Sequence, residues 1–228
     1  GMQWKRFADW DIRESWAARI PGIKKIYSPL RVLSAQFFES FDFSHYDLVI
    51  SSTNMYMAKA VRTQPPTKHL CYCHTPPRSL YDYTTMMDWK KNPIIRIGGE
   101  LINHFMRIVD FRTAQRPDLF IANSKEVQRR IKKFYRRDSI VVYPPIDVPP
   151  TPPQRKEKKE HFILYVGRLG VSKHVDLVIE ACNQLKQPLK LVGVGRDMNY
   201  LKSLAGPTVE FFGSVSDETL HDLYARAH

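Results

Sequence analysis

The sequence lacks several features that would assign a protein to a class at once. It has no apolar run near the ~20 residues that a membrane span needs, and its longest apolar runs have the length of strands. Met2 to Ile12 mix charge with tryptophan and have no apolar core, so we expect no signal peptide. A Walker loop, a Gly-x-Ser-x-Gly elbow and zinc-finger spacing are also missing. These absences argue against a membrane-spanning protein, a P-loop hydrolase, an α/β-hydrolase and a zinc finger.

Cysteine is scarce, with Cys71, Cys73 and Cys182 making an odd count without scaffold spacing. This usage is typical of a reducing compartment, so we expect a cytoplasmic protein. His69 and His74 beside the first two cysteines raise the possibility of a metal site. On a strand, however, Cys71 and Cys73 share a face while His74 points away, and zinc sites favour wider cysteine spacing. We therefore predict buried small side chains and no bound metal.

Positive charge is in excess, with a net charge of +12 and a pI near 9.6. Nucleic acid, anionic lipid or a phosphorylated substrate could bind through such charge. For the first of the two basic clusters named below, a solvated helix face is an equally open interpretation. The two basic clusters are Arg129, Arg130, Lys132, Lys133, Arg136 and Arg137, and then Arg155 to Lys159.

Proline is concentrated at one place, the segment 144–160, where a charge run follows six prolines. So many prolines exclude a helix or a central strand and favour a stiff connector. We interpret 144–160 as a linker between an N-terminal domain, 1–143, and a C-terminal domain that begins at 161 and continues to 228.

Near-continuous apolar runs of strand length occur in the N-terminal domain and predict a parallel sheet that is buried on both faces. Between the second and third runs a helix is predicted over about Gly99 to Arg116, and another begins at Ser124, a plausible N-cap. The runs are Asp47 to Ser51, His69 to Cys73, Asp118 to Ala122, and Ser139 to Tyr143.

The C-terminal domain repeats strand, turn and helix three times, which predicts a doubly wound α/β fold. Its three predicted strands make an unusually small open sheet, and Met2 to Ser44 offer neither a first strand nor a glycine-rich turn. We therefore expect an α/β chain with two Rossmann-like domains and parallel sheets, both incomplete.

The turn that follows the strand Phe162 to Val166 carries the strongest chemical signal. Gly167 lets backbone approach a ligand, and the N-terminus of the next helix presents N–H groups to an anion. Arg168 adds a planar fork for phosphate oxygens, and Lys173 adds a point charge. Such a group suits a departing diphosphate, although an ordinary βα turn with exposed basic residues has the same composition.

Several motifs in the expected order resemble glycosyltransferase family 4, whose members are retaining enzymes of the GT-B fold. The likeness spans roughly Phe41 to His228, and the N-terminal motifs look like a bacterial mannosyltransferase-like branch. The motifs are YVGRL at 165–169 with Lys173 and VDLVIEA at 175–181, LVGVGR at 191–196, VEFFGSVSDE at 209–218, YDLVISS at 46–52, CYCHTPPR at 71–78 and FIANS at 120–124.

The resemblance implies roles for individual residues. Gly167, Arg168 and Lys173 would bind the donor diphosphate and stabilise it as it leaves, and His74 would lie near the transferred sugar as the catalytic-site histidine. Arg78 and Ser124 would face the cleft that the family has between its two domains, although helix capping explains Ser124 almost as well. Those placed near the nucleotide are Gly193, Gly195, Arg196, Val215 and Ser216.

The same resemblance implies transfer of a hexose, most plausibly mannose from GDP-mannose, to a lipid-linked or polysaccharide acceptor with retention. It implies no metal and no cofactor apart from the nucleotide-sugar substrate. The basic helix at Arg129 to Arg137 is a candidate for peripheral contact with an anionic membrane at its inner face.

The sequence departs from the family pattern at one later segment. In the family, two glutamates with seven residues between them contact the sugar and the ribose. The sequence has no such segment before His228, and the glycine-rich loop of the first domain is missing, so we expect residues 1–228 to be catalytically inactive or nearly so.

Other interpretations fit less well. A dehydrogenase fingerprint at Gly193 to Gly195 has Met198 in place of its third glycine. A basic nucleotide- or nucleic-acid-binding module without transferase activity is the main alternative, yet Phe134 and Tyr135 fall on the apolar face of their helix. We therefore expect no nucleic-acid partner.

Overall fold

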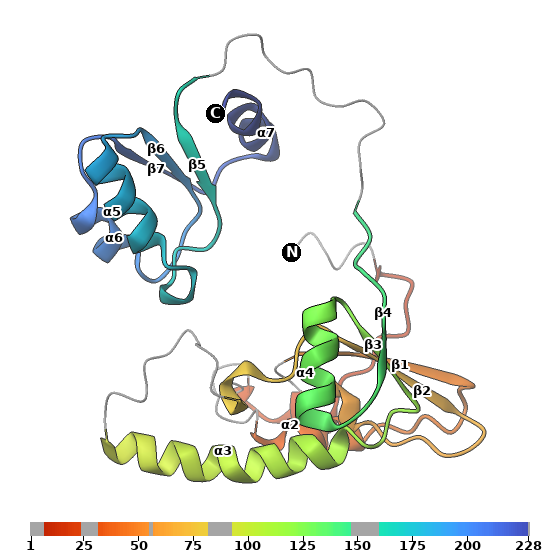
Figure 1. Ribbon diagram of the computed structural model, residues 1–228. Coiled ribbons are helices and arrows are strands. Elements are labelled where there is room, and N and C mark those ends of the chain that lie inside the picture. The colour runs from red at the N-terminus through yellow and green to blue at the C-terminus, as the bar shows by residue number, and fades with distance from the viewer. Residues whose placement is uncertain (1–6, 24–31, 55–56, 82–92, 147–159, 228) are drawn as a thin grey trace. The chain divides into compact units, whose positions relative to one another are not determined.

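Two compact units make up the chain. The computed structural model describes residues 7–23, 32–54, 57–81, 93–146 and 160–227. Unit 1 contains the described residues up to Pro145, and unit 2 contains Ile146 and 160–227 (Figure 1). Most of the predicted linker, 147–159, lies outside the described residues.

Unit 1 is built on a four-stranded parallel sheet, with its strands side by side in sequence order. The predicted α/β class with two parallel sheets is confirmed, since unit 2 contains the second one. The strands of unit 1 are β1 (Leu48–Thr53), β2 (Lys68–Cys73), β3 (Leu119–Ala122) and β4 (Ser139–Val141).

Helix α4 (Lys125–Tyr135) covers one face of this sheet. Its buried side chains, Val127, Ile131 and Tyr135, recur at helical spacing, and they pack with Phe120 of β3. Burial of a side chain such as Ile131 contributes about 1.5–3 kcal/mol, so this face fixes the helix on the sheet.

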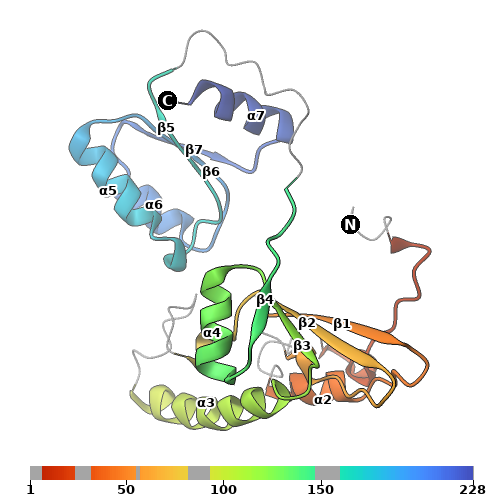
Figure 2. The same ribbon diagram turned by 45° about the vertical axis from the view of Figure 1, so that its right-hand side comes forward.

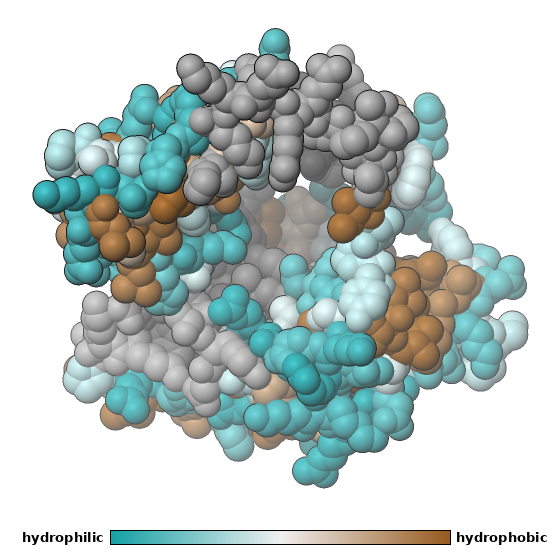
Figure 3. All heavy atoms as spheres, turned by 45° about the horizontal axis from the view of Figure 1, so that its top comes forward, coloured by the Kyte–Doolittle hydropathy of each residue, from teal (hydrophilic) through white to brown (hydrophobic). Residues whose placement is uncertain are grey.

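The other face of the sheet is partly exposed, which corrects the prediction of burial on both faces. Burial alternates along β1, and Leu48 and Ile50 are 47% and 65% exposed. Side chains alternate between the faces of a strand, so an apolar run places half of its residues on each face. In Figure 3, apolar residues gather on the right, the side on which β1 and β2 lie in Figure 1.

Helix α3 (Pro93–Thr113) begins six residues before the predicted start at Gly99. Pro93 occupies its first position, where a missing N–H group costs nothing, and the helix continues through Gly98 and Gly99. Its inner side packs with α2 (Ser34–Glu39) in a second core cluster. No helix among the described residues is both long and apolar enough to cross a membrane.

Unit 2 has a three-stranded parallel sheet in the order β5-β6-β7, between two layers of helices (Figure 2). Helices α5 and α6 pack on one face, around Leu189 and Leu191, and α7 packs on the other through Leu223. The elements are β5 (Ile163–Val166), α5 (Val175–Leu185), β6 (Leu189–Val192), α6 (Met198–Leu204), β7 (Val209–Gly213) and α7 (Asp217–Arg226).

Candidate functional site

Three turns follow the strands of unit 2 at the carboxyl edge of its sheet, and backbone hydrogen bonds join them. The N–H group of Gly167 donates to the carbonyl of Val192 at 3.0 Å, at the start of the second turn. The N–H group of Gly193 donates to the carbonyl of Gly213 at 2.7 Å, at the start of the third. These bonds fix the three turns as one backbone platform at the edge where open α/β sheets bind ligands.

Two glycines of the second turn are required by this packing. Gly193 has a φ of +135°, and a Cβ atom there would stand 1.9 Å from the carbonyl oxygen of Gly167. A Cβ atom on Gly195 would stand 1.8 Å from the carbonyl oxygen of Leu169. Neighbouring backbone therefore requires glycine at both positions.

The two predicted diphosphate-binding cations are exposed on the first turn. Arg168 follows Gly167 directly, and Lys173 ends a short 3-10 turn, Val171–Lys173, whose last N–H group donates to Gly170 at 2.8 Å. Helix α5 then begins at Val175, after His174 in a left-handed conformation, with no side-chain cap among the described residues. The first N–H groups of α5 therefore have no side-chain acceptor among the described residues, which is the state that an anion site at a helix N-terminus requires.

The remaining residues predicted near the nucleotide lie on the second and third turns. Arg196 is exposed directly after Gly195. Val215 packs against the core cluster under α7, and Ser216 caps α7 by accepting a hydrogen bond from the N–H group of Thr219 at 3.2 Å. Because both side chains have structural contacts, a ligand here would meet mainly their backbone.

His74 lies at the carboxyl edge of the unit 1 sheet, directly after β2. Its ring is exposed, its Nε2 is 2.9 Å from the Oγ of Ser52, and its backbone N–H group donates to Thr53 at 2.9 Å. Tyr72 contacts the ring edge to face at 5.2 Å. These contacts orient the imidazole on β1 and β2, and Ser52 is a partner that the sequence motifs did not indicate.

Ser124 shares this edge with His74, because the last residues of β2 and β3, Cys73 and Ala122, are paired. The Oγ of Ser124 accepts from the N–H group of Val127 at 3.2 Å, which confirms the predicted N-cap. Residues 74–77, between β2 and the next 3-10 turn, form the His74 loop. Arg78 is exposed and begins that turn, Arg78–Leu80. His74, Ser124 and Arg78 belong to unit 1, whereas the predicted diphosphate residues belong to unit 2.

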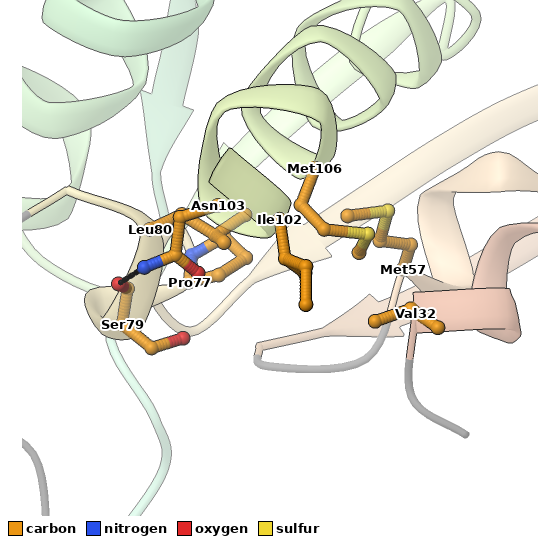
Figure 4. Close-up of a pocket in the computed structure, with 8 residues that line it drawn as sticks. All are labelled: Val32, Met57, Pro77, Ser79, Leu80, Ile102, Asn103 and Met106. Atoms are coloured by element: carbon orange, nitrogen blue, oxygen red, sulfur yellow. Dashed lines mark hydrogen bonds between the residues drawn. The ribbon is translucent and has the colours of Figure 1, made fainter. Parts of the chain in front are cut away.

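A small cavity of about 40 Å³ lies beside the His74 loop in unit 1 (Figure 4). Ile102 and Met106 of α3 line it together with Met57, and the amide of Asn103 donates to the carbonyl of Ser79 at 3.4 Å. By this measure one water molecule needs about 10–15 Å³, so the cavity has room for a few water molecules and is too small for a sugar or a lipid chain.

A buried ionic group beneath the His74 loop was missed by the sequence analysis. Lys59 forms an ion pair with Asp110 of α3, both side chains being fully buried, and the hydroxyl of Tyr81 donates to Asp110 at 2.8 Å. Burial, and then Asp110, raise the pKa of Tyr81. Tyr81 also stacks on Phe134 at 4.0 Å, so the group ties the loop to α3 and α4. The available signal was an aspartate on the core side of an amphipathic helix.

Cys71, Cys73 and His69 of β2 behave as core residues. Cys71 and Cys73 are fully buried while His74 is exposed, as the strand alternation predicts. Burial raises the pKa of Cys71 to about 11 and raises that of Cys73 further. His69 is buried with its Nε2 2.8 Å from the Oγ of Ser51, and burial lowers its pKa to about 4. Within the described part of the chain, no group of three or more metal-binding side chains occurs.

Two family models match the chain. Residues 10–148 match the model described as Glycosyltransferase Family 4, and residues 151–228 match the model described as Glycosyl transferases group 1. No protein of curated function matches the sequence.

Two solved structures illustrate what the chain is similar to. One is a lipopolysaccharide outer core galactosyltransferase, WaaB, in its apo form, with 15% identity and a TM-score of 0.45 over 89% of this chain. Another is the pneumococcal O-GlcNAc transferase GtfA in complex with UDP and GlcNAc, with 16% identity and a TM-score of 0.43 over 80% of this chain. The chain spans 52% and 37% of their respective lengths.

Proposed function

The chain belongs to glycosyltransferase family 4, and on that premise we propose that it takes part in the transfer of a hexose from a nucleotide sugar to an acceptor. The observation that carries this proposal is the turn platform of unit 2, with exposed Arg168 and Lys173 next to the uncapped start of α5. Two cations and open N–H groups would hold the diphosphate and stabilise the charge that develops on it as the glycosidic bond breaks.

The donor is proposed to be GDP-mannose and the acceptor a lipid-linked or growing glycan, with retention at the anomeric carbon. The motif resemblance supports this choice. His74 would contact the transferred sugar and orient it, because Ser52 and Tyr72 hold its ring in place at the sheet edge. No residue of the chain is assigned as a general base, and no metal is required for the proposed step.

A nucleic-acid-binding module is less well supported. Tyr135 is fully buried, and Phe134 is stacked on Tyr81, so these aromatics are not available as base-stacking platforms.

The basic face of α4 is also largely occupied. Arg129 and Arg130 pair with Glu126, Lys132 pairs with Asp138, and Arg137 donates to backbone carbonyls of residues 114–118. The carboxylates of Glu126 and Asp138 lower the net positive charge of this face, so its attraction to anionic lipid should be weaker than its basic residues alone would give.

Calorimetric titration of the 228-residue chain with GDP, UDP and ADP tests the donor site. Arg168→Gln and Lys173→Gln should each weaken diphosphate binding by about 10- to 100-fold, since charge-assisted hydrogen bonds contribute about 1.5–3 kcal/mol. Lys202 is an exposed lysine on α6 of unit 2, so Lys202→Gln is the matched control and should change the nucleotide affinity little. Absence of binding by all three nucleotides, or equal losses in the control, would contradict the proposal. If the chain bound single-stranded nucleic acid in a salt-dependent way and none of the nucleotides, the nucleic-acid-binding module would be favoured.

The sugar end has its own test. His74→Ala should leave GDP affinity unchanged and reduce the additional affinity of GDP-mannose over GDP.

A further inference from the structure

Helix α3 has a continuous row of apolar side chains on its exposed side. Ile94, Ile97, Leu101, Phe105 and Ile108 follow one another at intervals of three and four residues, so they share one face. Their exposed fractions are 81%, 75%, 59%, 59% and 38%. A helix on the surface of a globular unit normally turns such a face inward, and this one presents it to the outside.

The orientation of α3 is fixed by its opposite side. Asp110 lies in the buried ion pair with Lys59, while Met106 and Val109 pack in the core cluster with α2. The guanidinium of Arg107 donates to the carbonyl of Leu80 at 3.0 Å. Turning the apolar row inward would expose these core contacts and separate the buried charges, so the row stays outside.

Positive charge lies at the C-terminal end of the apolar row. Arg112 is exposed on the same face of α3 as the row, about five turns after Ile94, and the guanidinium of Arg136 lies over the ring of Phe111 at 5.9 Å. The two acidic side chains of α3 both face cations. Asp110 pairs with Lys59, and Glu100 lies 4.0 Å from Arg107. Apolar side chains bordered by arginines on one helix are typical of a segment that lies in the interface of an anionic membrane.

We propose that α3 is a membrane-contact helix, whose row Ile94, Ile97, Leu101, Phe105 and Ile108 enters the interface of an anionic bilayer. Arg112 and Arg136 face the phosphate headgroups at the C-terminal end of the row. The positive charge of these arginines complements anionic headgroups, and this complementarity selects an anionic bilayer as the partner. The contact is a surface one, because the cavity behind Ile102 is too small for a lipid chain.

Vesicle flotation of the 228-residue chain tests the proposal without any sugar donor, so its outcome is independent of the proposed transfer reaction. The chain should bind vesicles of phosphatidylcholine mixed with phosphatidylglycerol and bind phosphatidylcholine alone more weakly. The variant Ile97→Gln/Leu101→Gln/Phe105→Gln should lose at least about tenfold in partitioning, since it removes three apolar contacts. These side chains are exposed, so circular dichroism should show an unchanged fold.

Leu177→Gln/Leu185→Gln is the matched control, because both leucines are exposed on α5 of unit 2, at 59% and 68%. This variant should bind vesicles as the parent does. Equal binding by the α3 variant, or an equal loss in the α5 control, would overturn the proposal.

A probe on the row separates lipid from a second copy. The native thiols are all buried, so Ile97→Cys can be labelled selectively with a polarity-sensitive fluorophore, with Leu185→Cys as the control. We expect a blue shift at position 97 when anionic vesicles are added, and none at 185. A blue shift at 97 that rises with protein concentration before lipid is added, and does not change with lipid, would assign the surface to self-association and overturn the membrane contact.

Discussion

A Cβ atom built on Gly193 would stand 1.9 Å from the carbonyl oxygen of Gly167, across the contact between two turns of unit 2. The same two turns are joined by the hydrogen bond from the N–H group of Gly167 to Val192. The edge proposed to bind the diphosphate therefore depends on one backbone contact that tolerates no side chain.

Gly193→Ala should destabilise unit 2 by at least about 3 kcal/mol, because it adds this clash to a strained φ of +135°. Hydrogen exchange should show faster exchange in β5, β6 and β7 with little change in unit 1. Gly98→Ala is the control, since Gly98 is inside α3 with nothing within 4 Å of the added atom. It should stabilise the helix by about 0.5–1 kcal/mol. Unchanged protection of unit 2 in Gly193→Ala would contradict the close turn contact.

Much of the secondary structure follows from local patterns. The three predicted repeats of strand, turn and helix in the C-terminal domain occur as β5 and α5, β6 and α6, and β7 and α7, because each combines a regular apolar period with clear breaks. Ser124 was identifiable as an N-cap for the same reason. These features depend on a few neighbouring residues.

Other features depend on contacts far apart in sequence. The pairing of Lys59 with Asp110 joins residues 51 positions apart, and neither local period nor propensity indicates which buried charge meets which. The exposure of Ile50 and of the α3 row also depends on which elements cover each face. The sequence indicated the residue types at the sheet edges, whereas the Ser52 contact of His74 required the strand register.

Lys59→Met should lower the free energy of unfolding by about 3–5 kcal/mol, because Asp110 would remain in the core as an unpaired charge. Lys59→Met/Asp110→Leu should recover part of this loss, since it removes both charges. Urea unfolding of the single and double variants gives the coupling, expected to be above about 1 kcal/mol. Additive losses would mean that the two side chains are not paired in solution.

Acid should destabilise unit 1 through His69, whose pKa is lowered by burial from 6.5 to about 4. Between these values the unfolded chain binds more protons than the folded chain, so stability falls as the pH decreases. Above pH 6.5 His69 is neutral in both states and does not lower the stability. By pH 4 the cost of keeping it unprotonated in the folded chain lowers the free energy of unfolding by up to about 3 kcal/mol. Urea unfolding of His69→Gln should show a flatter dependence over this window. His45→Gln, which removes an exposed imidazole from the same unit, should keep the parent slope.

The thiols should be unreactive in the folded chain. Burial raises the pKa of Cys71, Cys73 and Cys182, and the thiolate is the reactive form. An aromatic disulfide reagent at mildly alkaline pH should label none of them within minutes, and all three should react in guanidinium chloride. Rapid labelling of the native chain would show that one of these core regions opens readily.

Ser124 has two proposed roles, helix cap and cleft residue, that substitution can separate. Ser124→Ala should cost about 1 kcal/mol, because the N–H group of Val127 loses its acceptor. Ser124→Asp should keep the parent stability, since aspartate is an equally good cap and its charge suits a helix N-terminus. Urea unfolding measures both.

Nucleotide-sugar affinity then decides the second role. If capping is the whole role of Ser124, Ser124→Asp should bind GDP-mannose as the parent does. A capped and stable Ser124→Asp that nevertheless loses affinity for GDP-mannose, while its affinity for GDP is unchanged, would mean that the proposed sugar site rejects the added carboxylate. His74 lies on the same edge of the same sheet, so His74→Ala should then show the same selective loss. Agreement between the two variants would assign this edge of unit 1 to the sugar, independently of the diphosphate contacts in unit 2.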